Sequence, residues 1–144
     1  MAAPIRVLIA EPDPRARFAL QTFLNAHPHI VVVAEAEAPA AALVLARAHA
    51  PTVAIVDLPA PIRAERLSLV RTLSGRLEIP VIAIGLEYDV RESALTAGAI
   101  RFLEKAEVPD RLVDALTIAA RAAGARHRVK CHSRRLPDVA GGVA

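Results

Sequence analysis

Two carboxylates and a lysine follow three of the apolar runs in this sequence, where buried strands are expected to end. Glu11 comes directly after the first run, Asp57 closes the third, and Lys105 stands just beyond the fifth. The carboxyl ends of parallel strands meet at one edge of a sheet, so these side chains are expected to converge. Paired carboxylates favour a hard cation such as Mg²⁺. Asp57 is then placed to attack phosphorus as a carboxylate nucleophile, and Lys105 to offset the charge of the transferred group.

The apolar runs that position these groups have the length and composition of buried strands. They are four to six residues long, and the first four are rich in Val and Ile. Their apolar character is continuous rather than alternating, which is typical of parallel strands covered on both faces. The fifth is weaker because Arg101 interrupts it. The runs are Ile5–Ala10, Ile30–Ala34, Val53–Asp57, Pro80–Ile84 and Ile100–Leu103.

Stretches with helical spacing of apolar residues separate the runs. Asp13 and Pro14 form an N-cap and a first-turn proline for the first helix. The later helices are expected over Ala40–Ala50, Ile62–Leu77, Asp89–Ala97, and from Pro109-Asp110 to about Arg121. Five repeats of strand and helix predict an α/β fold, a doubly wound five-stranded parallel sheet of the flavodoxin-like (βα)5 kind.

Charge is distributed unevenly between the body of the chain and its end. Residues 1–120 carry 12 Lys and Arg against 14 Asp and Glu, whereas residues 121–144 carry six against one. We expect one domain over residues 1–122 and a basic, flexible tail over 123–144. The tail is the expected contact if nucleic acid or an acidic partner is bound, although a solvated run of charge is the commoner reason for such a segment. Its three histidine and cysteine residues lack a fourth ligand for zinc.

Other features indicate a cytoplasmic protein. The single cysteine, Cys131, excludes an internal disulfide framework and suits a reducing compartment. The first apolar run ends at Ala10, too short for a signal peptide or a membrane span.

Four segments resemble the receiver domains of response regulators in two-component signalling. TVAIVDLPAP is similar to the phosphorylation-site strand, and AGAIRFLEK to the run that ends in the family's lysine. IRVLIAEPDPRAR and PVIAIG are similar to its first and fourth strands. The resemblance covers residues 5 to about 120 and is nearest to receivers that carry a C-terminal helix-turn-helix.

This resemblance assigns expected roles to individual residues. It implies that Asp57 is the phosphoacceptor, that Glu11 and Asp13 form the acidic pocket, and that Lys105 pairs with the phosphoryl group. Gly85 and Phe102 occupy the switch positions. An Mg²⁺ ion is expected on Glu11, Asp57 and the main-chain carbonyl of Pro59. For Asp13, capping the first helix is the favoured role, because an aspartate before a helix is more often a cap than a ligand.

Two positions depart from the family pattern. Pro12 stands where the family has a second acid that binds the metal directly, and proline has no side-chain ligand, so Mg²⁺ binding is expected to be weakened. Restoring that ligand with Pro12→Asp should raise the affinity for Mg²⁺. Gly85 stands where the family has the Ser or Thr whose hydroxyl follows the phosphoryl group. Its absence is expected to loosen the coupling between phosphorylation and the switch.

Two functions remain open from the sequence. The first is a phosphorylation-dependent signalling switch that takes a phosphoryl group from a sensor histidine kinase, with self-catalysed transfer but no turnover chemistry. The second is a degenerate pseudo-receiver, a phosphorylation-independent interaction module with a role in transcription. It would form a homodimer through the last two helices. Asp57 and Lys105 favour the first; Pro12 and Gly85 favour the second. A flavodoxin-like cofactor binder is disfavoured because the acidic, glycine-free segment after Ala10 would repel phosphate.

Overall fold

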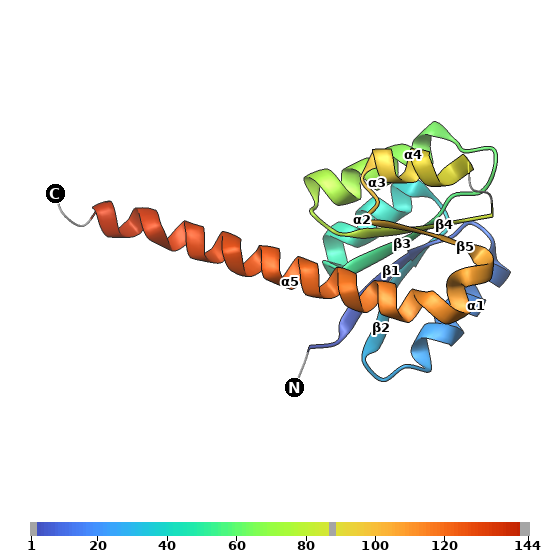
Figure 1. Ribbon diagram of the computed structural model, residues 1–144, viewed down its shortest axis with the longest axis horizontal. Helices are drawn as coiled ribbons and strands as arrows, with labels where there is room; N and C mark the ends of the chain where they lie inside the picture. The colour runs from blue at the N-terminus through green and yellow to red at the C-terminus, as the bar shows by residue number, and fades with distance from the viewer. Residues whose placement is uncertain (1–2, 87–88, 142–144) are drawn as a thin grey trace.

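The computed structural model describes residues 3–86 and 89–141, with side chains described through residue 126. Five parallel strands form one sheet in the order β2-β1-β3-β4-β5 (Figure 1). The strands are β1 (Ile5–Ala10), β2 (Ile30–Ala36), β3 (Val53–Asp57), β4 (Val81–Gly85) and β5 (Arg101–Glu104). The predicted doubly wound parallel sheet is confirmed, and every strand lies within two residues of its expected bounds.

Helices cover both faces of this sheet. The elements are α1 (Pro14–Asn25), α2 (Pro39–His49), α3 (Ala64–Arg71) with a π-helical turn η1 (Thr72–Arg76), α4 (Asp89–Ala97), a 3₁₀ turn η2 (Lys105–Glu107) and α5 (Val108–Gly141). Helices α1 and α5 lie on one face, and α2, α3 and α4 on the other (Figure 1). Each face has its own core of aliphatic residues and alanine, which accounts for a stable fold with few aromatics.

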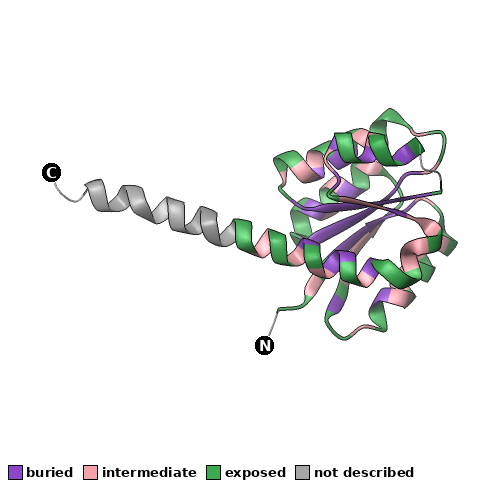
Figure 2. Cartoon of the chain, viewed as in Figure 1, coloured by how far each residue is buried: buried purple, intermediate pink, exposed green. Residues whose placement is uncertain are grey.

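The central strands are the most deeply buried part of the molecule. Every residue of β3 and β4 is buried, as Figure 2 shows for the middle of the sheet. Strand β3 pairs with β1 on one side and with β4 on the other. The chain order reverses between β1 and β3, and in such sheets the crevice outside their carboxyl ends is where ligands bind. The end of β3 is Asp57.

Helix α5 continues well beyond the expected end near Arg121. Its first part packs on the sheet through Leu112, Ala115, Leu116 and Ala119, and the helix then extends past the edge of the sheet to Gly141 (Figure 1). The apolar stripe stops with the sheet, but Ala, Arg and Lys are strong helix formers without tertiary packing. The end of a buried stripe therefore did not mark the end of the helix. A flexible tail over residues 123–144 stays a prediction.

No helix among the described residues is both long and apolar enough to cross a bilayer.

Candidate functional site

The ends of β1, β3 and β5 bring Glu11, Asp57 and Lys105 into one pocket. The main-chain N–H of Glu11 donates to the carbonyl of Ala36 at 2.9 Å, which extends the pairing of β1 with β2 by one residue. Asp57 is the last residue of β3, and Lys105 begins the 3₁₀ turn that follows β5. The two carboxylates are 2% and 4% exposed. The three groups predicted from the strand ends therefore do lie together.

Lys105 and Asp57 form an ion pair across this pocket. The distance from Lys105 Nζ to Asp57 Oδ1 is 3.5 Å, longer than the roughly 2.7–2.9 Å of a strong charge-assisted hydrogen bond. Within the described part of the chain, Asp57 Oδ1 and Glu11 Oε2 are buried without a hydrogen-bond partner. Buried carboxylate oxygens that lack hydrogen bonds are costly in free energy unless a ligand supplies the missing contacts. The pocket is therefore built to receive a further group.

Burial sets the protonation of Glu11. Loss of solvation raises its pKa from 4.5 to about 8; a hydrogen bond to Asp57 and the negative charge of Asp57 act in the same direction. The positive charges of Lys105 and then Arg66 oppose this rise. At neutral pH and without a bound cation, the carboxyl group of Glu11 is therefore mostly protonated.

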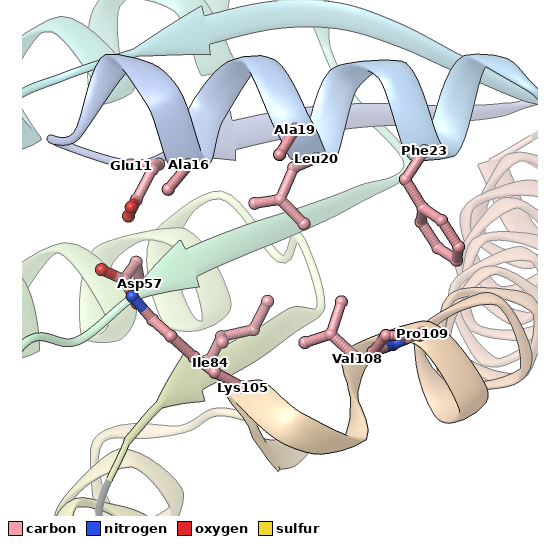
Figure 3. Close-up of a pocket in the computed structure, with 10 residues that line it drawn as sticks. All are labelled: Glu11, Ala16, Ala19, Leu20, Phe23, Asp57, Ile84, Lys105, Val108 and Pro109. Carbon is pink, nitrogen blue, oxygen red and sulfur yellow. The ribbon is translucent and has the colours of Figure 1, made fainter.

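An apolar cavity adjoins these charged groups. It has a volume of about 300 Å³ and lies between α1 and the start of α5. Figure 3 shows Glu11, Asp57 and Lys105 together at one end and apolar side chains along the rest. The apolar lining consists of Ala16, Ala19, Leu20, Phe23, Ile84, Val108 and Pro109. A molecule that enters between α1 and α5 would therefore reach Asp57.

Three other residues expected at the pocket lie at its margin or outside it. Asp13 is exposed and caps α1, because its Oδ1 accepts a hydrogen bond from the N–H of Arg15 at 2.9 Å. It does not line the cavity with Glu11, and its expected place in the acidic pocket stays a prediction. Pro12 and Pro59 are partly exposed and follow Glu11 and Leu58 in the chain.

The two switch positions are in direct contact. A β-carbon on Gly85 would lie 3.0 Å and 3.1 Å from the Cε2 and Cζ atoms of Phe102, and 3.4 Å from the carbonyl oxygen of Leu58. The ring of Phe102 packs against the core on the α2–α4 side of the sheet. The space that a Ser or Thr side chain would need next to β4 is thus occupied by Phe102.

Two arginines hold the main chain of the carboxylate residues, and the sequence interpretation missed both. Arg17 of α1 donates to the carbonyl of Glu11 at 2.8 Å, and Arg66 of α3 donates to the carbonyl of Asp57 at 3.2 Å. Arg66 is 7% exposed. A signal existed for it: Arg66 stands at the first position of the i, i+3, i+4 pattern that continues with Leu69 and Val70, where an aliphatic residue is expected.

The fold and the pocket define a class: a doubly wound domain whose central strand ends in a buried aspartate paired with a lysine. Comparison with known families agrees, since the family model described as the response regulator receiver domain matches residues 7–117. The chain belongs to the response regulator receiver domain family. The resemblance seen in the sequence is confirmed.

Curated relatives carry the name protein-glutamate methylesterase/protein-glutamine glutaminase. One from Rhodopseudomonas palustris (strain BisB18) is 34% identical, over 82% of this chain and 36% of that protein. One from Anaeromyxobacter dehalogenans (strain 2CP-C) is 35% identical, over 88% of this chain and 38% of that protein. The chain therefore spans little more than a third of the length of these relatives.

Solved structures show the same fold. The response regulator domain of Thermotoga maritima CheB superimposes with a TM-score of 0.73 at 21% identity, over 82% of this chain and 97% of that one. A two-component response regulator of the LuxR family from Aurantimonas sp. SI85-9A1 gives 0.73 at 22% identity, over 83% and 87% of the two chains.

Proposed function

We propose that this receiver domain accepts a phosphoryl group on Asp57 and acts as a phosphorylation-dependent signalling switch. The observation that carries the proposal is the buried Asp57 carboxylate, which is paired with Lys105 at 3.5 Å and has an oxygen without a hydrogen-bond partner in the described residues. Nucleophile and cation are held by the ends of two strands, so the site needs no rearrangement to form.

The transfer reaction follows from this arrangement. An oxygen of Asp57 attacks the phosphorus of the donor, a new O–P bond forms, and the bond between phosphorus and the donor's leaving atom breaks with its electron pair on the donor. With a phosphohistidine donor the leaving atom is a ring nitrogen. Lys105 offsets the negative charge of the transferred oxygens, because its ammonium lies on the same side of the pocket as Asp57.

An Mg²⁺ ion fits this pocket through two carboxylates. Glu11 and Asp57 each offer a buried oxygen without a hydrogen-bond partner in the described chain, and Mg²⁺ is often held by one or two carboxylates together with water and phosphate oxygens. When bound, the ion would neutralise charge on the phosphoryl group. Pro59 would add its main-chain carbonyl. No cluster of three or more His, Cys, Asp or Glu suited to a metal occurs among the described residues.

The partners follow from the same chemistry. We propose a sensor histidine kinase as the phosphodonor and a cytoplasmic setting in which the two meet. We also propose a homodimer through α4 and α5, and contact of the basic residues after Arg121 with nucleic acid. No turnover reaction is proposed for this chain, since the match to the named methylesterases covers little more than a third of their length.

The phosphorylation-independent interaction module is the less favoured function. A degenerate receiver without phosphoryl chemistry has no need for a lysine directed at a buried aspartate, and this chain has that pair. The contact between Gly85 and Phe102 concerns a later step, the passage of the signal to the surface.

Intact-mass measurement tests the proposed function. The wild type and Asp57→Asn are incubated with Mg²⁺ and a small acyl phosphate, with circular dichroism to verify folding. A single phosphoryl adduct is expected on the wild type and none on Asp57→Asn. If the folded wild type gains no adduct, or if the variant gains the same one, the assignment of Asp57 is wrong.

A further inference from the structure

Arg66 is a buried cation at a position suited to an aliphatic residue. It is 7% exposed and lies on the buried side of α3 with Leu69 and Val70. Arginine is almost never buried to this extent without a partner, because removing its charge from water is costly. Core packing alone therefore does not account for an arginine here.

The guanidinium of Arg66 connects three elements of the fold. Its Nη1 donates to the carbonyl of Asp57 and its Nη2 to the carbonyl of Glu37, both at 3.2 Å. The planar fork of a guanidinium suits two acceptors held at a fixed separation. Helix α3 is thereby tied to the end of β3 and to the residues after β2. The residue that is held is the phosphoacceptor itself.

The partners of Arg66 are neutral, so its charge is not cancelled. Among the residues whose side chains are described, no carboxylate forms an ion pair with it, and its guanidinium contacts the main chain of Asp57. The positive charge of Arg66 therefore lies next to a pocket in which Pro12 stands where the family has an acid. A fixed cation and one fewer acid change the pocket's charge in the same direction.

We propose that Arg66 is a positioning residue of the phosphoryl-accepting site: it holds the main chain of Asp57 and supplies a permanent positive charge next to that residue. The inference rests on the proposed function and assigns to α3 a part in it. With Lys105, this charge offsets the incoming phosphoryl group and reduces the site's need for Mg²⁺.

The two contributions of Arg66 have opposite effects on Mg²⁺ binding. Removal of a cation near a divalent-ion site lowers the repulsion and tightens Mg²⁺ binding. Loss of order at Asp57 would weaken it. Measuring Mg²⁺ affinity and phosphorylation rate on the same variants therefore separates a charge in the site from a purely structural role.

The experiment compares Arg66→Met with Arg71→Met, which removes the same charge from an exposed position on the same helix. Mg²⁺ affinity is measured by calorimetry without phosphodonor, and phosphorylation by intact mass with a small acyl phosphate at saturating Mg²⁺. We expect Arg66→Met to bind Mg²⁺ about three- to tenfold more tightly and to be phosphorylated about ten- to a hundredfold more slowly. Arg71→Met should match the wild type in both.

Rescue by lysine sharpens the test. Arg66→Lys retains the charge but cannot reproduce the guanidinium fork. Its Mg²⁺ affinity should stay near that of the wild type, while its phosphorylation rate should lie between those of the wild type and Arg66→Met.

Several results would overturn the proposal. If Arg66→Met and Arg71→Met have the same Mg²⁺ affinity and the same phosphorylation rate, Arg66 has no part in the site. If Arg66→Met binds Mg²⁺ more weakly than the wild type, the role of Arg66 is purely structural. Should Arg66→Met fail to fold, Arg66→Leu replaces it, since leucine completes the apolar stripe of α3. Unfolding of both would assign Arg66 to the core and also overturn the proposal. A folded wild type that is never phosphorylated would refute the proposed function, and the Mg²⁺ measurement would still decide on the charge.

Discussion

The two sides of the pocket at the carboxyl edge of the sheet are filled in different ways. Toward β1 and α5, Glu11 and Asp57 have buried oxygens without hydrogen-bond partners in the described chain, next to a cavity of about 300 Å³. Toward β4 and β5, Gly85 and Phe102 pack so closely that a β-carbon would not fit without movement. The side with Glu11 and Asp57 has a cavity and carboxylate oxygens that a ligand could contact. On the side with Gly85 and Phe102, the aromatic ring fills the space. The proposed acceptance of a phosphoryl group and the proposed transmission of its arrival therefore involve different sides of the pocket.

The largest effect is expected on the side with Glu11 and Asp57, as a change of the free energy of unfolding with pH. Glu11 has a pKa of about 8 in the folded protein against 4.5 ordinarily, so between these values the native state binds more protons than the unfolded state. The stability that Glu11 contributes is then fully present below about pH 4.5 and is lost as the pH rises through 8. Glu11→Gln should remove this loss and be more stable than the wild type at pH 8.5 by a few kcal/mol.

Urea unfolding at pH 5 and pH 8.5 with EDTA measures this difference. Other titrating groups affect the wild type and Glu11→Gln alike, so only the difference between the two profiles matters. Parallel profiles would show that the burial of Glu11 carries no stability cost and that the two sides of the pocket do not differ in this respect.

An intermediate effect is expected on the packed side. Gly85→Ala introduces a β-carbon 3.0 Å from the ring of Phe102, and overpacking of this kind costs about 1–3 kcal/mol. Gly75→Ala is the matched control, because nothing lies within 4 Å of its β-carbon and alanine is favoured over glycine in a helical turn by about 0.5–1 kcal/mol. Urea unfolding of both variants tests the contact. If the two variants are equally stable, the ring of Phe102 moves aside at little cost, and its contact with Gly85 does not restrict the side chain at position 85.

The smallest effect is expected at position 12, where the family has an acid that binds the metal. Pro12→Asp adds a carboxylate one residue after Glu11, and we expect about tenfold tighter Mg²⁺ binding, about 1.4 kcal/mol. Pro14→Asp adds the same charge at the exposed start of α1 and controls for general electrostatics. Calorimetric titration with Mg²⁺ distinguishes them. Equal affinities for the two variants would mean that position 12 does not face the metal site.

Much of the fold and part of the site followed from local patterns. The continuous apolar runs predicted all five strands, because strands covered on both faces need apolar side chains at every position. The groups at the strand ends, Glu11, Asp57 and Lys105, lie together for the same topological reason. Asp13 was predicted both as pocket acid and as helix cap, and only its cap contact is present. Spacing along the chain cannot choose between such roles, since both need a carboxylate near a helix start.

Other features depended on contacts between residues distant in the chain. The sequence showed that Gly85 lacks a hydroxyl, but the ring of Phe102 against it appears only in three dimensions. The cavity beside Asp57 arises because α1 presents Ala16 and Ala19 toward the start of α5.

The amino-acid sequence alone determined the parallel α/β class of the sheet, the strand ends and the residue types of the candidate pocket, because each is encoded in short runs and their endings. Tertiary structure alone decided which of these groups are buried without partners and which arginine holds the carbonyl of Asp57. It also set the protonation of Glu11 at neutral pH. The physical reason is that desolvation and hydrogen bonding depend on what surrounds a group in space, and the neighbours of Glu11 and Asp57 come from helices and strands far along the chain.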